Sequence, residues 1–481
     1  MKKTTLLFIF LMAILFVTSC HKDPVITDSS AKISFSQDSV LFDTVFVKLG
    51  STTKQIKIYN KNSKRIVISS IQLSQTGNSM FRLNVNGSPG KVFKDVEVPA
   101  KDSIFIFIEV TVDPGNVNNP FIVADAIEFQ TNGNKQQVNL VAWGQNAHYI
   151  RPTVLSTNGL PNYSIIACDT TWGDNLPHVV YGFAVVNANC RLTIGPGAKI
   201  YFYKNSGLWI FKNGALTVSG TKEAPVIFQG VRREPEYKEA AGQWDRIWIN
   251  ESSHNSSINY AIIKNGFIGL QAEALDLKNT LGNTLTVRNT IIKNMSGWGV
   301  LSRVYNITAK NLVVSNCAAY NLSVTGGGTH EYKHCTFANF WSGSPRKTPA
   351  VNLSNYFDRG NTRISNNLTK ALFGNCIIYG NTDNEIGTDF LPGASSNYVF
   401  DHCILKIDPA TTTGPDHFTT IIKNSSIPFK TFTDFSLNAN ASAIDAGLLQ
   451  YGSDVPFDIL GTQRNSAGNP LPDIGAYEFN P

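Results

Sequence analysis

NTIIKN at residues 289–294 is the first of five similar segments, and it is followed by NLVVSN (311–316), HCTFAN (334–339), NCIIYG (375–380) and HCILK (402–406). Their first residues are 22, 23, 41 and 27 positions apart. We interpret 41 as roughly two steps of the repeat and 27 as one step with a loop. An earlier copy, YAIIKN (260–265), lies 29 residues before the first and leaves room for a loop around Glu273–Gly282. The chain from residue 150 onward is therefore a repeat array.

A step near 22 residues matches the length of one coil of a parallel β-helix. One such coil cannot bury its own apolar strand, so stacking of coils must supply the core. The sequence thus predicts an all-β fold class in which residues 150–481 form a parallel β-helix with a C-terminal cap.

Two further stretches carry a family resemblance. LTIGPGAKIYF (192–202) and IFKNGALTVSGTKEAPVIFQG (210–230) look like the opening coils of bacterial β-helix repeat proteins. LNANASAIDAG (437–447) and DIGAYEF (473–479) resemble the C-terminal block of secreted β-helix proteins, many from Bacteroidota. The resemblance implies a right-handed parallel β-helix. It assigns no activity, because this scaffold carries lyases, hydrolases, adhesins and inert stalks.

Residues 32–147 show a different pattern, with apolar residues at every second position, as in Ile104, Ile106 and Ile108. This period is typical of half-buried strands. Asn132-Gly133 between two such runs is a hairpin signature. Seven or eight strands without a cysteine predict an immunoglobulin-like β-sandwich. The segment resembles the immunoglobulin-like modules of Bacteroidota surface lipoproteins, and 144–148 is the expected boundary.

The N-terminus has the features of an export signal. Lys2 and Lys3 precede an apolar run from Leu6 to Val17, which is too short to span a membrane and is typical of a secretory signal peptide. Val17-Thr18-Ser19-Cys20 resembles the lipobox of bacterial lipoproteins. This implies cleavage after residue 19 and acylation of Cys20, with residues 20–31 as a tether. Since His21 is not the Asp of an inner-membrane retention signal, the resemblance favours the outer membrane, on its periplasmic or extracellular face.

The charge balance argues against a polyanion partner. The whole chain has 41 basic and 35 acidic side chains, and removal of Lys2 and Lys3 with the signal peptide reduces the excess further. No run of Lys and Arg occurs that could track a phosphate backbone, so we exclude nucleic acid as a partner. The expected partners are the membrane, through the lipid anchor, and a polysaccharide.

Six cysteines remain besides Cys20. Cys335, Cys376 and Cys403 occupy one aligned position of the repeat, which predicts a column of buried free thiols, because free Cys packs as a small hydrophobe. Cys168 and Cys190 could bridge the first coil, and the sequence leaves this open. Asn265, Asn294, Asn316 and Asn339 end successive copies and predict an asparagine ladder at one corner, since Asn tolerates left-handed backbone.

No complete catalytic set is visible. Glycoside hydrolases need paired carboxylates, and lyases need a basic residue beside an acidic sugar. Asn381-Thr382-Asp383 matches one element of the polygalacturonase pattern, but its partner motifs are absent. At the C-terminus an ion-paired cap over the last coil is favoured over a calcium site, and it would contain Asp458, Arg464, Asp473 and Glu478.

Two insertions supply candidate binding residues. Val231–Asp245 ends beside Trp244 and Trp248, which are four apart and therefore expected on one face of a strand, where indole rings suit sugar rings. Ser342–Lys370 contains four basic candidates, Arg346, Lys347, Arg359 and Arg363, with Asp358 nearby. Long loops on solenoids often build binding faces.

Two function classes remain besides a purely structural stalk. The favoured one is a non-catalytic cell-envelope lipoprotein that presents a β-helix for glycan binding or another surface interaction. The alternative is a polysaccharide lyase or glycoside hydrolase on the same scaffold. A purely structural stalk without a ligand is the third hypothesis. We expect no cofactor, with calcium as an option.

Overall fold

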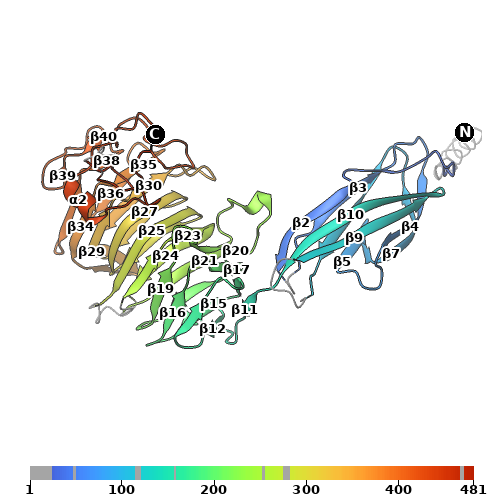
Figure 1. The fold of residues 1–481 in the computed structure, drawn as a ribbon, viewed down its shortest axis with the longest axis horizontal. Helices are drawn as coiled ribbons and strands as arrows, with labels where there is room; N and C mark the ends of the chain where they lie inside the picture. Colours follow the sequence, from blue (N-terminus) through green and yellow to red (C-terminus); the bar gives the residue numbers. More distant parts are fainter. Residues whose placement is uncertain are drawn as a thin grey trace, which may run out of the picture. The chain divides into compact units, whose positions relative to one another are not determined.

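The computed structural model describes residues 24–46, 50–113, 121–156, 159–251, 255–274, 282–465 and 471–480. The signal peptide, Cys20 and the first residues of the expected tether lie outside these ranges. The chain divides into two compact units, Met1–Asn146 and Ala147–Pro481, and the division falls within the expected boundary. Both units are built from strands (Figure 1), as the all-β fold class requires.

The first unit contains two five-stranded sheets. One has the order β1 (Ser34–Phe35), β3 (Lys54–Tyr59), β8 (Ser103–Val110), β5 (Phe81–Val85), β6 (Ser88–Gly90). The other has the order β2 (Ser39–Phe46), β10 (Asn134–Gln145), β9 (Phe121–Thr131), β4 (Ile66–Leu73), β7 (Val92–Val98). The alternating residues Ile104, Ile106 and Ile108 are buried in their shared core.

The hairpin predicted in this unit is present. β9 and β10 pair antiparallel, with Asn134 opposite Thr131. Asn132 and Gly133 between them have φ of 48° and 81°. Positive φ at both central residues is what a two-residue type I′ turn requires, which explains the Asn-Gly pair.

The described part of the expected tether is not a free linker but packs against the first unit. Val25 forms a parallel bridge with Arg65, and the Ile26 N–H donates to the Arg65 carbonyl at 2.9 Å. Ala31 is only 3% exposed. Residues 25–31 therefore lie against the first unit, because their apolar side chains find partners there, and the expected tether is too long at its C-terminal end.

The second unit is a stack of coils with three parallel strands each, as expected for a β-helix-like fold. We call the three stacks ladders 1, 2 and 3. Ladder 1 contains β13 (Thr170–Trp172), β16 (Arg191–Ile194), β19 (Ala215–Ser219), β22 (Ser256–Asn259), β29 (Gly328–Lys333), β34 (Leu368–Gly374), β37 (Ser396–Asp401) and β39 (Phe418–Thr419). Ladder 2 contains β11 (His148–Ile150), β14 (His178–Val180), β17 (Lys199–Phe202), β20 (Val226–Gly230), β23 (Ala261–Lys264), β30 (Thr336–Asn339), β35 (Ile377–Gly380), β38 (Ile404–Leu405) and β40 (Ile422–Lys423).

Two long strands, β25 (Thr284–Met295) and β27 (Asn306–Cys317), bend and contribute to both of these ladders. Ladder 3 contains β12 (Tyr163–Ile165), β15 (Phe183–Val186), β18 (Gly207–Ile210), β21 (Trp244–Ile249), β24 (Gly266–Glu273), β26 (Trp298–Arg303), β28 (Leu322–Thr325), β31 (Val351–Ser354) and β36 (Ile386–Asp389). All strand pairs within the three ladders are parallel.

The repeat alignment is confirmed residue by residue in ladder 2. The fourth residues of the copies pair in sequence, from Ile263 through Ile292, Val314, Phe337 and Ile378 to Leu405. The first residue of every copy has positive φ, between 47° and 53°, in Tyr260, Asn289, Asn311, His334, Asn375 and His402. Each copy therefore begins at a left-handed corner between ladders 1 and 2.

The interpretation of the 41-residue step as two coils was wrong. β30 pairs directly with β35, so a single coil separates them. The extra length lies in the loop after β30 and in a hairpin formed by β32 (Tyr356–Arg359) and β33 (Thr362–Ser365). The segment Ser342–Lys370, expected as one insertion, also contains β31, a regular strand of ladder 3.

The predicted thiol column is confirmed. Cys335, Cys376 and Cys403 are free, fully buried and part of the core inside the coils. The Cys376 N–H approaches Cys403 Sγ at 3.4 Å. Burial raises the pKa of the Cys376 thiol, and the neighbouring thiols act in the same direction. The column therefore packs as a neutral core element.

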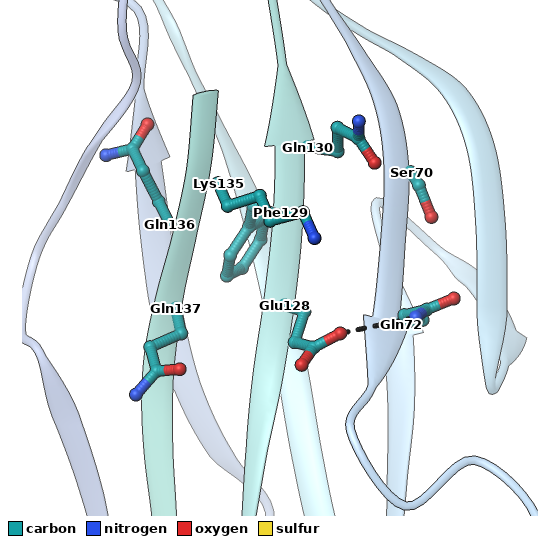
Figure 2. Close-up of a pocket in the computed structure, with 8 residues that line it drawn as sticks. All are labelled: Ser70, Gln72, Glu128, Phe129, Gln130, Lys135, Gln136 and Gln137. Atoms are coloured by element: carbon teal, nitrogen blue, oxygen red, sulfur yellow. Dashed lines mark hydrogen bonds between the residues drawn. The ribbon is translucent and has the colours of Figure 1, made fainter. Parts of the chain in front are cut away.

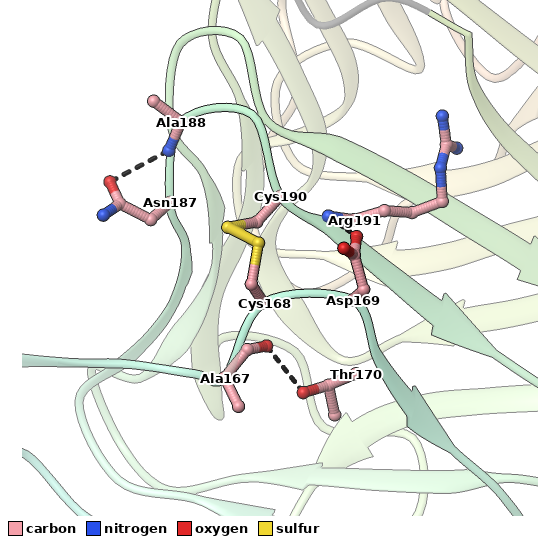
Figure 3. Close-up of a disulfide and its surroundings, with 8 residues drawn as sticks. All are labelled: Ala167, Cys168, Asp169, Thr170, Asn187, Ala188, Cys190 and Arg191. Atoms are coloured by element: carbon pink, nitrogen blue, oxygen red, sulfur yellow. Dashed lines mark hydrogen bonds between the residues drawn. A yellow bond between two sulfur atoms is a disulfide. The ribbon is translucent and has the colours of Figure 1, made fainter.

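Cys168 and Cys190, which the sequence left open, form a disulfide with an S–S distance of 2.08 Å (Figure 3). They precede β13 and β16, which pair with each other in ladder 1. The bond thus joins two neighbouring coils at the start of the stack.

The C-terminal block is ion-paired as expected, but its contacts run along the side of the stack. Arg464 pairs with Glu478, and both are buried. Arg464 Nη2 donates to Asn311 Oδ1 at 2.9 Å, and the Gly475 N–H donates to the Asn375 carbonyl at 2.8 Å. The block covers outward apolar residues of ladder 2, such as Ile377, which need a partner that the coil interior cannot provide.

The buried histidine of ladder 1 predicts acid sensitivity. Burial lowers the pKa of His330 to about 4, while its Nε2 lies 3.3 Å from the Gly327 carbonyl. The unfolded chain takes up the proton near pH 6.5, and the folded chain only near pH 4, so stability present above pH 6.5 is lost as the pH falls towards 4. His330 alone accounts for ~3 kcal/mol of this loss.

We therefore expect the free energy of unfolding, measured by urea titration at several pH values, to fall between pH 6.5 and pH 4. His330→Gln keeps an amide donor for the Gly327 carbonyl but cannot titrate, so its unfolding free energy should fall less steeply across the same window. An equal slope for both proteins would contradict the assignment.

Candidate functional site

One groove of the second unit collects residues from both insertions that the sequence singled out. Its volume is about 690 Å³. We call it the corner groove, and it is lined by Glu239, Ala240, Ala241, Lys293, Asn294, Ser315, Asn316, Phe340, Trp341, Ser342, Gly343, Thr433 and Phe435. Residues of the two insertions therefore meet in one groove, although the residues that line it are others than the predicted candidates.

Aromatic rings form one wall of the corner groove. Phe340 lies 4.8 Å from Phe432 and 6.4 Å from Phe435, measured between ring centroids. Of the rings that line the groove, Phe340 and Trp341 are partly exposed, whereas Phe435 is only 5% exposed. Phe432, which packs on Phe340 beside the groove, is 57% exposed. Rings that stay accessible beside polar groups suit sugars, because the apolar face of a pyranose stacks on a ring while its hydroxyls bond outward.

The first insertion forms the opposite wall. It contains a short 3-10 helix, η1 (Pro235–Tyr237), and returns to the coil through Gln243, whose Nε2 donates to the Tyr237 and Ala240 carbonyls at 2.7 and 2.9 Å. Glu239 then faces the coil, where it pairs with Lys293 Nζ at 3.0 Å. One carboxylate is thus fixed at the edge of the groove.

The predicted asparagine corner is present, but its side-chain amides bond mainly to the walls of the groove and less to one another. Asn265, Asn294 and Asn316 have positive φ, whereas Asn339 does not. A direct ladder bond links Asn294 to Asn265 at 3.4 Å. The other bonds reach the walls: the Asn265 amide donates to the Lys238 carbonyl at 2.9 Å, and the Asn316 amide to the Phe432 carbonyl at 3.4 Å. Asn294 also donates to Glu239.

Trp341, directly after the HCTFAN copy, also lines the corner groove. Its indole N–H donates to Ser344 Oγ at 3.1 Å, and the ring remains partly exposed. A Cβ on residue 343 would lie only 2.6 Å from Trp341 Cζ2, so Gly343 is needed for the chain to pass this close to the ring. The Trp-Ser-Gly-Ser turn therefore sets the position of the indole.

Arg346 is not a solvated binding residue, as the sequence suggested, but the anchor of this turn. Its side chain is 1% exposed and pairs with the fully buried Glu385 at 2.6 Å. It also donates to the Asn339 carbonyl at 2.9 Å and to Asn381 Oδ1 at 2.7 Å, and Asn381 in turn holds the Trp341 carbonyl at 3.1 Å. Asn381, considered above as part of a catalytic pattern, thus has a structural role here.

The other basic candidates lie outside the groove. Lys347 is exposed on the turn. Arg359 and Arg363 are exposed on the β32–β33 hairpin, where Arg363 pairs with Asp358 at 2.9 Å and covers the Tyr356 ring. The structure therefore does not gather Arg346, Lys347, Arg359 and Arg363 into one site.

The two tryptophans expected on one face point in opposite directions. Trp244 is 1% exposed and stacks on Phe202 inside the coils, with centroids 4.6 Å apart. Trp248 lies on the outer side, stacked on Trp209 at 4.7 Å, and its indole donates to Glu273 at 2.8 Å. A register shift between Arg246 and Ile247 separates them, and a bulge of this kind reverses the alternation of faces. Trp244 is therefore a core residue.

Trp248 lines a separate hollow of about 610 Å³ together with Lys204, Asp245 and Arg246. A further hollow of about 360 Å³ lies on the first unit, over β4, β9 and β10 (Figure 2). There the Gln72 amide donates to Glu128 at 3.3 Å, and the only ring, Phe129, is buried. The corner groove is lined by three aromatic rings, Phe340, Trp341 and Phe435, together with amides and a carboxylate from several segments.

The chemistry available in the corner groove is binding. Glu239 is the only carboxylate among the described residues that line it, whereas glycoside hydrolysis needs two. Glu239 interacts with two cations. It pairs with Lys293, and its negative charge raises the pKa of Lys264, which burial lowers. A paired Glu239 can accept hydrogen bonds from hydroxyls.

Sequence reasoning missed Phe340, Trp341, Phe435 and Glu239. The sequence did contain a signal for Trp341, because the aromatic pair Phe340-Trp341 directly follows the polar last residue of a repeat copy. Phe435 had none, since it reaches the groove from a segment about a hundred residues away in sequence.

The buried pair under the groove predicts a contrast between two arginines. Arg346→Ala leaves Glu385 buried without its partner, which should cost about 3–5 kcal/mol of unfolding free energy. Arg363→Ala, which removes a solvent-exposed pair, should leave the unfolding free energy nearly unchanged. Chemical denaturation of both variants checks this, and equal losses would contradict the placement of Arg346.

Within the described residues there is no helix long and apolar enough to cross a membrane, and no cluster of three or more metal-ligating His, Cys, Asp or Glu. In the C-terminal block, Asp458 and Asp473 accept backbone N–H groups, including those of Thr462 and Phe479. Their oxygens thus serve the fold.

Comparison with known proteins assigns no family: no family model matches the chain, and no curated protein does. Solved structures give weak similarities only. A family 123 glycoside hydrolase from Clostridium perfringens is 12% identical over 24% of this chain and 26% of its own, with a TM-score of 0.17. This chain thus spans about a quarter of its length.

Two other structures are similarly distant. The PapD-like domain 7 of a human protein is 12% identical over 27% of this chain and 95% of its own, with a TM-score of 0.17. The catalytic unit of a family 87 α-1,3-glucanase from Streptomyces thermodiastaticus is 9% identical over 73% of this chain and 79% of its own, with a TM-score of 0.20. Similarities at this level establish neither a family nor an activity for this chain.

Proposed function

We propose that this protein binds a polysaccharide in the corner groove without cleaving it. The observation that carries the proposal is the convergence of aromatic rings, amides and one carboxylate from five segments on a single groove. Rings provide stacking and amides provide directed hydrogen bonds, which together are the usual chemistry of sugar recognition.

The setting of this groove is also a proposal. The lipobox resemblance supports a lipid-anchored protein of the outer membrane, acylated at Cys20, and the sequence patterns support a Bacteroidota-type surface lipoprotein. In this proposal the first unit is an immunoglobulin-like sandwich and the second is a right-handed β-helix. Two or more acyl chains would hold the protein stably at the membrane.

The test is a screen of host and plant polysaccharides with the purified exported chain, with and without calcium, that records binding and ultraviolet absorbance of the same samples. We expect binding without a product. Trp341→Ala should weaken binding about tenfold, since stacking on a ring is worth roughly 1–1.5 kcal/mol. Its melting temperature should change little, because the ring is partly exposed.

Trp248→Ala is the matched control, since Trp248 is also partly exposed but lies outside the groove. Binding that is lost in Trp248→Ala and kept in Trp341→Ala would move the site to the hollow around Lys204 and Arg246. Appearance of unsaturated products would place the protein among the polysaccharide lyases, with Lys293 as the first basic residue to replace. Release of reducing ends would favour the hydrolase alternative.

The anchor has its own test. Cys20→Ala should abolish the incorporation of radioactive palmitate and release the protein from the membrane fraction, because the thiol is the acylation site. Labelling that persists in the variant would overturn the lipoprotein proposal without affecting the groove.

A further inference from the structure

Three basic side chains lie one above another on the outer face of ladder 1. Arg288 of β25 pairs across the parallel strands with Lys310 of β27, and Lys310 pairs with Lys333 of β29. Neighbouring strands are about 4.8 Å apart, so these side chains leave the sheet at about that spacing. We call these three residues the basic column.

Carboxylates neutralise one end of this column. Lys333 Nζ lies 2.8 Å from Glu331 and also contacts Asp454, while Glu331 takes a second cation, Lys370, at 2.8 Å. The Lys310 ammonium donates to the backbone carbonyl of Asp454 at 3.1 Å. Two carboxylates, Glu331 and Asp454, are thus set against four cations. The four are Arg288, Lys310, Lys333 and Lys370.

The other end has an unbalanced positive charge. Over the part of the chain that the structure describes, no carboxylate forms an ion pair with Arg288 or Lys310. Arg288 is exposed. Like charges directly opposite on neighbouring strands are destabilising. Burial lowers the pKa of Lys310. The charges of Lys333 and Arg288 act in the same direction, whereas Asp454 and Glu331 act against it.

An aromatic side chain stands beside this charge. The chain leaves α2 (Leu449–Asp454) and passes the corner where the Asn311 amide donates to the Phe457 carbonyl at 2.8 Å. The Phe457 side chain is 53% exposed, and Leu460 is 52% exposed. Asn311 directly follows Lys310, so the backbone of Phe457, which carries an exposed ring, lies next to the unbalanced end of the column.

We propose that the basic column and Phe457 form a second binding surface, which takes a linear acidic polysaccharide. This local charge departs from the expectation, drawn from the charge balance of the whole chain, that no polyanion partner binds. Carboxylate or sulfate groups of the polysaccharide pair with Arg288 and Lys310, and a sugar ring packs on Phe457. Charge-assisted hydrogen bonds of this kind are about twice as strong as neutral ones. This surface goes beyond the corner groove, because Arg288 and Lys293 stand on the two sides of the bend at Asn289 in β25.

A glycan suits this surface better than a nucleic acid. Phosphate backbones are tracked by longer runs of Lys and Arg, whereas only two cations are unbalanced here. A polysaccharide with one charge per sugar needs only such a short column, together with a ring to stack on.

The experiment is titration calorimetry of the exported chain with polygalacturonate, with neutral dextran and with a DNA oligonucleotide, each at low and at raised sodium chloride. We expect polygalacturonate to bind and to weaken as salt rises, since surface charges are screened. Arg288→Gln and Lys310→Gln should each weaken it about tenfold and reduce the salt dependence by roughly one ion per removed charge.

Asp454→Asn provides a test of opposite sign, because removal of this carboxylate should strengthen polygalacturonate binding. Lys199→Gln is the control for general charge, since Lys199 is exposed on β17 of ladder 2. Trp341→Ala should not affect this binding, which separates the surface from the corner groove.

Three results would overturn the proposal: no binding of polygalacturonate, an equal loss in Lys199→Gln, or DNA binding as tight as that of the glycan.

Discussion

Parallel pairing of consecutive coils in fixed register is the constraint on which the second unit depends. Each strand bonds to the same position of the next coil, so residues of one type form columns through the stack. A slip of one residue would turn every inward side chain outward. The left-handed residue that opens each copy sets where the chain turns, and therefore which residues can pair.

Each column lies either in the core or on the outer surface of the coils. The second and fourth residues of each copy face inward, where Cys335, Cys376 and Cys403 pack without charge. The third residues face outward and are apolar except Thr336, whose Oγ1 accepts the Ala476 N–H at 3.0 Å, so the C-terminal block is needed as their cover. Arg464 of this block bonds to Asn311, whose own amide bonds to Asn289 at 2.9 Å, and this ties the cover to the corner between ladders 1 and 2.

The corner groove arises where two insertions leave this regular frame. The asparagines that end each copy hold the walls, and the buried pair of Arg346 and Glu385 fixes the turn that carries Trp341. A buried ion pair contributes little net stability but is costly to break, which makes it a means of fixing geometry. The groove is therefore rigid at its base, while its rings remain accessible.

The sequence by itself determined the all-β class, the coil period, the register of the copies, the inward thiol column and the Asn132-Gly133 hairpin. These features follow from alternation and from turn residues, which act over a few positions. Only the tertiary structure decided that the 41-residue step is one coil, that Trp244 is core and Trp248 is not, and that Arg346 is buried. The reason is physical: a bulge reverses the faces of β21, and Arg346 finds its partner 39 residues later, in the next coil. No local pattern records either event, because both depend on which strands come to lie side by side.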